Sequence, residues 1–131
     1  PAPHSRKLKI SEREPIRIHP VDAASRNIET GMIVRVFNTR GSCLAGAVVS
    51  DAVIPGVLQM ATGAWLDLSP EDGDGISLDK HGNANVLTRD FGTSEIAQGS
   101  TANSCLVETE RSAGVPPATT CFDPPAIIPK T

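Results

Sequence analysis

Residues 81–99 carry the side chains of this chain that are best suited to binding chemistry. The segment has no long apolar run and is rich in small hydrogen-bonding groups, namely Asn83, Asn85, Thr88, Thr93, Ser94 and Gln98. An Asn or Gln amide offers an acceptor and two donors, so such a set can recognise the ring edges of a polar ligand. The segment contains no evident pair of nucleophile and general base. It therefore predicts a surface outside the core that holds a ligand and carries out no reaction.

Two charged clusters are interpreted as solvated surface, with a phosphate-facing patch as the alternative for the basic one. Basic residues gather near the N-terminus at Arg6, Lys7, Lys9, Arg13 and Arg17, and acidic residues gather in a loop from Asp67 to Asp79. That loop, with Glu71, Asp72 and Asp74, lacks the ordered ligand spacing of a calcium loop. The net charge of −3 gives no general attraction to nucleic acid or to an anionic membrane. We therefore expect neither as a partner.

The cysteines indicate neither a disulfide framework nor a zinc site. Their number is odd and no Cys-x-x-Cys pair occurs among Cys43, Cys105 and Cys121. The histidines His4, His19 and His81 stand at no ligand spacing from them. We expect the three thiols to be small buried or half-buried side chains.

The elements that must position the polar segment are mostly short strands. Runs of β-branched residues predict strands over 14–20, 32–37, 42–49, 57–61 and 104–110, with short helices over 21–26 and 94–98. A chain of 131 residues with turns at this spacing is typical of one barrel or sandwich. It contains no apolar run long enough to span a bilayer, so we expect no membrane insertion.

Four motifs follow one another in a characteristic order. They are Arg-Glu-Pro-Ile-Arg-Ile-His-Pro-Val-Asp-Ala-Ala from Arg13, Gly-Met-Ile-Val-Arg-Val-Phe-Asn-Thr-Arg-Gly from Gly31, Thr-Gly-Ala-Trp from Thr62, and the segment 81–99. In this order they resemble the C-terminal molybdopterin-guanine-dinucleotide-binding domain of the dimethyl sulfoxide, trimethylamine N-oxide and biotin sulfoxide reductases. The resemblance extends roughly over residues 12–123.

The resemblance implies a mainly β fold, a six-stranded double-psi β-barrel like that of aspartate decarboxylase, with one or two short helices and long loops. Residues 1–123 would form the single domain and 124–131 a C-terminal tail. The implied cofactor is molybdopterin guanine dinucleotide, in the bis form that holds molybdenum in the complete enzyme. The implied partners are the remaining domains of that enzyme. The isolated chain would not be catalytic.

The resemblance also implies site residues, one position at a time. Asn85 matches best, since it stands where the family's loop keeps an Asn before Val-Leu-Thr, close to the pterin. Arg6 and Leu66 depart from the family, which has Gln and Tyr at these positions, so substrate preference does not transfer. The complete implied cofactor-binding set is His4, Ser5, Ala64, Trp65, His81, Asn83, Asn85, Thr93, Ser94 and Gln98.

Other interpretations of the same residues stay open at this point. Asn85 would equally suit a turn cap, and Thr93 and Ser94 helix N-caps. Trp65 suits packing, and His81 a surface loop. The chain as a whole would also suit a docking barrel for a protein or peptide. A self-cleaving enzyme of the aspartate decarboxylase type would use Gly41-Ser42 or Gly99-Ser100, but neither has the surrounding pattern.

Overall fold

The computed structural model describes residues 3–69, 78–99 and 104–129, and it confirms a mainly β chain. The helical elements in this part are α1 (Pro3–Lys7), α2 (Pro20–Ser25) and the 3-10 helix η1 (Ala84–Val86). None of the described helices has the length and apolar character needed to cross a membrane. The fold therefore depends on its strands.

One six-stranded sheet organises the described chain, and β3 (Ser42–Val49) lies at its centre. The strand order is β4-β1-β3-β2-β6, with β5 (Leu78–Asp79) paired to β3. The β3 strand runs parallel to β1 (Pro15–Ile18) and β5, and antiparallel to β2 (Ile33–Phe37). The end strands are β4 (Leu58–Met60) and β6 (Glu108–Arg111), and no pairing between them occurs in the described residues. The closed double-psi barrel thus stays a prediction.

The predicted strands form where β-branched residues alternate. Ile16 and Ile18 on β1, and Val34 and Val36 on β2, are each at most 2% exposed. All five predicted strands are confirmed: β3 has the predicted bounds, β1, β2 and β4 are shorter than predicted, and β6 begins four residues later and ends one residue later. The helix predicted over 21–26 is also confirmed, as α2, which begins at Pro20. The alternation of apolar and polar residues predicts these strands because each strand buries one face and leaves the other more exposed.

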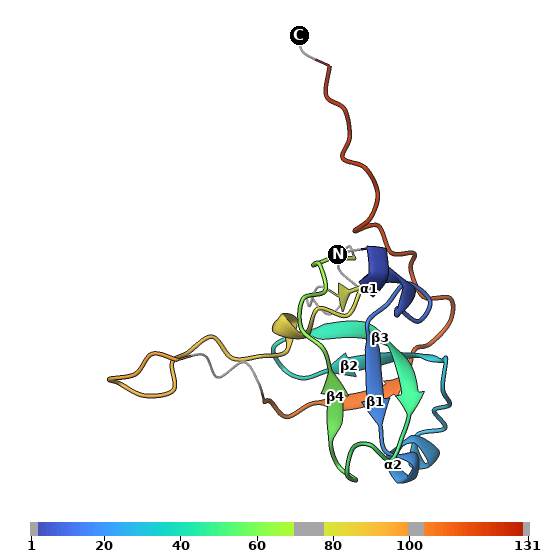
Figure 1. The fold of residues 1–131 in the computed structure, drawn as a ribbon, viewed down its shortest axis with the longest axis vertical. Helices are drawn as coiled ribbons and strands as arrows, with labels where there is room; N and C mark the ends of the chain where they lie inside the picture. The colour runs from blue at the N-terminus through green and yellow to red at the C-terminus, as the bar shows by residue number, and fades with distance from the viewer. Residues whose placement is uncertain (1–2, 70–77, 100–103, 130–131) are drawn as a thin grey trace.

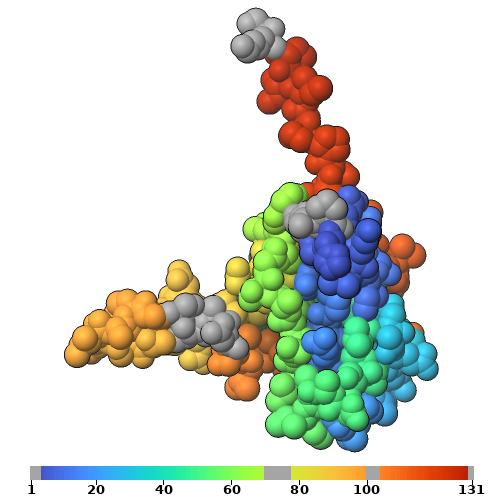
Figure 2. Space-filling view, viewed as in Figure 1, coloured from blue at the N-terminus to red at the C-terminus, as the bar shows by residue number. Residues whose placement is uncertain are grey.

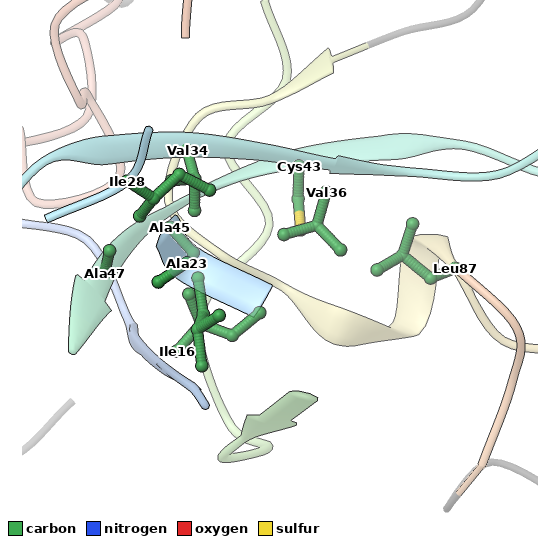
Figure 3. Close-up of a cluster of buried hydrophobic side chains, with 10 residues drawn as sticks. Ile16, Ala23, Ile28, Val34, Val36, Cys43, Ala45, Ala47 and Leu87 are labelled. Carbon is green, nitrogen blue, oxygen red and sulfur yellow. The ribbon is translucent and has the colours of Figure 1, made fainter. Parts of the chain in front are cut away.

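Leu87 of the polar segment belongs to the buried hydrophobic core. Figure 3 shows Leu87, just after η1, on the side of Val36 and Cys43 from β2 and β3, and all three belong to the buried core cluster. Leu87 is only 3% exposed. The prediction that residues 81–99 lie outside the core is therefore wrong for Leu87, and also for His81, which is 0% exposed. Cys43 is buried and Cys105 and Cys121 are half-buried, as expected.

The later residues of the polar segment, 89–99, project away from the sheet and its core. In Figure 1 a yellow-to-orange arm projects sideways beyond η1, and in the same view of Figure 2 it stands clear of the surface. The helix predicted over 94–98 is wrong, because this stretch consists of bends and irregular backbone. We call residues 89–99 the arm.

Several charged residues are buried where solvated surface was predicted. Arg13 is 4% exposed, and the Lys9 side chain is buried in an ion pair with Glu14. At the two ends of the acidic loop, Asp67 is 6% and Asp79 0% exposed. Glu71, Asp72 and Asp74 lie outside the described residues. The predictions of a solvated basic cluster and a solvated acidic loop are therefore wrong for these residues, because backbone groups or ion-pair partners replace water around their charges.

Candidate functional site

Phe122 brings the N-terminal helix together with two of the predicted site residues. Its ring centroid lies 5.0 Å from that of His81, edge-on, and 6.1 Å from that of Trp65. The Arg6 guanidinium carbon lies 4.3 Å from the same centroid. The helix α1, which carries His4 and Ser5, therefore stands beside Trp65 and His81. The sequence pattern did not single out Phe122 or Arg6 as site residues.

His81 is buried with one ring nitrogen satisfied and one not. Its Nδ1 lies 2.9 Å from the Trp65 carbonyl oxygen, and because a carbonyl only accepts, this contact puts the proton on Nδ1. In the neutral ring Nε2 is then an acceptor, and it has no hydrogen-bond partner in the described part of the chain. The interpretation of His81 as a surface-loop residue is wrong. A buried acceptor without a donor is uncommon in folded proteins and calls for a physical reason.

Asp79 fixes the backbone that follows His81. Its Oδ2 accepts hydrogen bonds from the amides of His81 (3.3 Å), Gly82 (2.7 Å) and Asn83 (2.7 Å). Its Oδ1 accepts from the Asp67 amide at 2.8 Å. Gly82 fits this turn because its φ is +98° and a Cβ would lie 2.7 Å from the Glu14 Cβ. Sequence analysis missed Asp79 by assigning it to a solvated acidic loop.

Asp67 fastens the C-terminal segment to the same place. Its carboxylate accepts from the Thr120 amide (2.6 Å), the Thr120 hydroxyl (2.7 Å) and the Cys121 amide (3.0 Å), and it lies 3.2 Å from Lys80 Nζ. Burial by itself raises the pKa of Asp67, but the hydrogen bonds from Thr120, Lys80 and Cys121 outweigh it and the pKa is lowered. These contacts hold Phe122 against His81.

Asn85 is exposed on a 3-10 turn that is held at both ends. At the start, the Asn83 side chain caps η1 by accepting from the Asn85 amide at 3.0 Å. At the end, the Leu87 carbonyl accepts from Asn38 Nδ2 and Arg40 Nε, both at 2.8 Å. The backbone of Asn85 is therefore fixed while its side chain faces solvent.

Thr93, Ser94 and Gln98 lie on the exposed arm and bond within it. The Thr93 hydroxyl donates to the Ala97 carbonyl at 2.7 Å, and the Ser94 hydroxyl accepts from the Ala97 amide at 2.8 Å. Gln98 Nε2 donates to the Ser94 carbonyl at 2.8 Å. The two hydroxyl residues cap a turn of the arm and not a helix. No described contact joins these three residues to Trp65, His81 or α1.

Ala64 is buried beside the exposed Trp65, on the stretch that receives the His81 hydrogen bond. Within residues 3–69, 78–99 and 104–129, no group of three His, Cys, Asp or Glu side chains is arranged to hold a metal ion. The groups that the site leaves open to a ligand are the amide of Asn85, the imidazole of His81 and the ring of Trp65, while the carboxylates of Asp67 and Asp79 bond to backbone. Such groups suit the recognition of a polar heterocycle.

Comparison with known proteins agrees with this chemistry. Residues 2–106 match the family described as "Molydopterin dinucleotide binding domain". The chain is 46% identical over 119 residues to a trimethylamine-N-oxide reductase of Haemophilus influenzae, covering 91% of this chain and 14% of that protein. It is 47% identical over 116 residues to a dimethyl sulfoxide/trimethylamine N-oxide reductase of Cereibacter sphaeroides, covering 88% and 14%. A trimethylamine-N-oxide reductase of Salmonella typhi is 50% identical over 117 residues, covering 89% and 14%.

The chain thus spans about a seventh of the length of these relatives. The findings support molybdopterin guanine dinucleotide, the cofactor expected from the sequence. Since the family match extends over most of the chain, the resemblance noted from the sequence is confirmed. The chain belongs to the molybdopterin dinucleotide binding domain family.

Proposed function

We propose that this chain binds molybdopterin guanine dinucleotide as a domain of an S- or N-oxide reductase. The observation that carries the proposal is Asn85, an exposed amide on a backbone segment held at both ends, within a chain of this family. A group held in place before the ligand arrives loses little freedom on binding. The binding face would comprise α1, Ala64, Trp65 and residues 81–88.

The residues present fit such a ligand. The guanine and pterin rings each carry N–H donors and ring acceptors, which amide side chains can pair. The buried Nε2 of His81 has no hydrogen-bond partner in the described structure and can pair with such a ring. Arg6, over the Phe122 ring at the edge of this face, adds positive charge for a pyrophosphate. Polar groups left unpaired without their ligand favour selective binding.

The chain's own task in this proposal is placement. When bound, the cofactor with its molybdenum supplies the oxygen-atom transfer chemistry. Asn85 and Asn83 would orient the pterin, and Trp65 would cover a ring face. His4 and Ser5 on α1 would border the same face, and the arm, with Thr93, Ser94 and Gln98, would reach the ligand or the rest of the enzyme. None of these residues acts as an acid, base or nucleophile.

The remaining domains of the parent reductase are the proposed partners. The arm exposes Phe91 at 56% and Ile96 at 98%, although its hydrogen bonds are mainly internal. Apolar side chains on a projecting loop are typical of a surface that becomes covered by protein. In this proposal the arm docks on those domains, and the anchored face binds the cofactor.

The test is an amide NMR titration of this chain with guanosine diphosphate, with adenosine diphosphate as the control ligand. We expect selective shifts around Asn85 with the guanine nucleotide. Asn85→Ala should weaken that binding about tenfold, as expected for the loss of a polar contact to a base. Gln59→Ala, which removes an exposed amide from β4 outside the proposed face, is the matched control. Equal responses to both nucleotides, or none, would count against the proposal.

A further inference from the structure

We propose that Asp79 is a positioning residue, whose buried carboxylate sets the conformation in which Asn85 is presented to the cofactor. The inference rests on the proposed function, since it concerns the same face. Asp79 itself would not touch the ligand. It acts through the backbone of residues 81–83 and through the side chain of Asn83.

The Asp79 carboxylate is buried and surrounded by backbone amides. Asp79 is 0% exposed, and no ion pair to it occurs in the described residues. Its two oxygens instead accept from the amides of Asp67, His81, Gly82 and Asn83. A buried carboxylate that is stabilised by amides imposes a specific backbone path, because a different path would leave it without donors.

The central strand β3 supports the Asp79 carboxylate from beneath. Asp79 lies on β5, which pairs in parallel with the central strand β3, so that Asp79 stands opposite Cys43. Cys43 belongs to the buried core. The acceptor that organises the turn is therefore itself fixed by the sheet, and this explains how a strand of only two residues contributes to the site.

Asn83 links the Asp79 carboxylate to Asn85. The Asn83 amide donates to Asp79 Oδ2 at 2.7 Å, and the Asn83 side-chain oxygen accepts from the Asn85 amide at 3.0 Å. Two hydrogen bonds thus connect the buried carboxylate to the start of η1. The far end of η1 is held independently by Asn38 and Arg40. Removing the first support should release Asn85 without disturbing the second.

Asp67→Asn provides the matched control for Asp79→Asn. Both replacements exchange a buried carboxylate for an amide of the same shape. The Asp67 carboxylate, however, bonds to Thr120, Cys121 and Lys80, and only its backbone amide reaches Asp79. Asp67→Asn should therefore loosen the C-terminal segment and leave the turn at residues 81–83 in place.

The experiment measures amide hydrogen exchange and guanosine diphosphate affinity for the wild-type chain and both variants. In Asp79→Asn we expect exchange at Gly82, Asn83 and Asn85 to become about tenfold faster, with the amides of β2 and β3 unchanged. We expect guanosine diphosphate to bind about tenfold more weakly. Asp67→Asn should leave exchange at these three amides unchanged, and Gln59→Ala, outside the binding face, should change neither exchange nor affinity. Unchanged exchange in Asp79→Asn, or unchanged affinity despite faster exchange, would overturn the proposal.

Failure of the proposed function is distinguishable from failure of this inference. If the wild-type chain ignores guanosine diphosphate, the proposed function fails, and exchange alone decides on Asp79. Faster exchange confined to residues 82–85 would then support its positioning role, and unchanged exchange would overturn it.

A second pair of variants keeps the test open if Asp79→Asn does not fold. Asn83→Ala removes the cap on η1 without touching the buried carboxylate, so exchange at Asn85 should become faster. Asn83→Asp keeps an acceptor at the same place and should restore slow exchange. Equal exchange in Asn83→Ala and the wild type would contradict the link from Asp79 to Asn85.

Discussion

Residues 79–88 and the arm, residues 89–99, are neighbouring parts of one polar stretch, and they are held in different ways. The first part is tied to the body by the Asp79 carboxylate, the buried Leu87 side chain, and the Asn38 and Arg40 side chains. The hydrogen bonds of Thr93, Ser94 and Gln98 stay within the second part. Similar composition thus yields one anchored and one self-contained segment.

The comparison teaches where a preformed contact with a ligand is to be expected. A side chain on the anchored segment loses little backbone freedom on binding, whereas a residue of the arm has more freedom to lose. We therefore expect Asn85 to contribute to binding by the isolated chain. We expect Thr93, Ser94 and Gln98 to contribute once the arm is covered by other domains.

The largest expected effect concerns two thiols next to the compared regions, Cys43 on β3 opposite Asp79 and Cys105 after the arm. Burial, with smaller contributions from Asp79 and Cys105, raises the pKa of Cys43 from 9.0 to about 12. The reactive thiolate of Cys43 is then about a thousandfold scarcer at pH 8 than that of an ordinary cysteine. Cys105, which follows the arm, is only half-buried. Alkylation followed by mass spectrometry should label Cys105 long before Cys43. Equal labelling rates would mean that the core around Cys43, which supports the anchored segment, opens readily.

Leu87→Ala should weaken the attachment of residues 79–88 to the core and destabilise the fold. Leu87 is 3% exposed, and replacing a buried Leu by Ala lowers the free energy of unfolding by about 2–5 kcal/mol. Ile96→Ala on the arm, where Ile96 is 98% exposed, should change it by less than about 0.5 kcal/mol. Urea unfolding of both variants measures the difference. Similar losses of unfolding free energy in the two variants would contradict the distinction between an anchored segment and a self-contained arm.

Asp67→Asn should remove a stabilising effect that depends on pH. The pKa of Asp67 is lowered in the folded chain, so its carboxylate stabilises the fold above the ordinary value of 3.8, and this contribution disappears as the pH falls below it. At neutral pH we expect a loss of about 1–3 kcal/mol from the donors of Thr120 and Cys121. Unfolding at pH 7 and pH 3 should show the wild type and the variant converging at the lower pH. If the free energies of unfolding of the wild type and the variant differed equally at both pH values, the effect would come from packing and not from the charge of Asp67.

Ser94→Ala sharpens the comparison with the smallest effect. It removes a turn cap inside the exposed arm, and we expect a change below about 0.5 kcal/mol in the free energy of unfolding. The local effect should be visible as lower heteronuclear NOE values for residues 94–98. A loss as large as that of Leu87→Ala would show that the arm contributes to the folded body.

The strands were predictable because their signal is local. Ile16 and Ile18, and Val34 and Val36, alternate with residues of the opposite face, and this period of two reports a half-buried strand without knowledge of its partner. β5 escaped prediction because two residues carry no period, and its identity depends on pairing with Ser42 and Cys43. The helix predicted over 94–98 failed because the polar side chains of Ser94 and Gln98 bond to nearby backbone.

The site was predictable only in its chemical type. Its amide-rich composition pointed to a polar ligand, and the order of its motifs identified the family, but the burial of His81 and the contacts of Phe122 were not visible. His81 and Phe122 meet because Asp67 binds Thr120 and Cys121, which lie more than fifty positions away. Contacts at such separation follow from the path of the whole chain and leave no local pattern.

The sequence by itself determined the strand periods, the family and the class of ligand, because these depend on neighbouring residues and on the order of motifs. The tertiary structure decided that Asp79 and Asp67 are buried anchors and that Asn85 and Ser94 belong to differently held segments. The physical reason is that a carboxylate is equally polar in any sequence. Whether it is solvated or surrounded by backbone donors depends on which distant amides the fold brings to it.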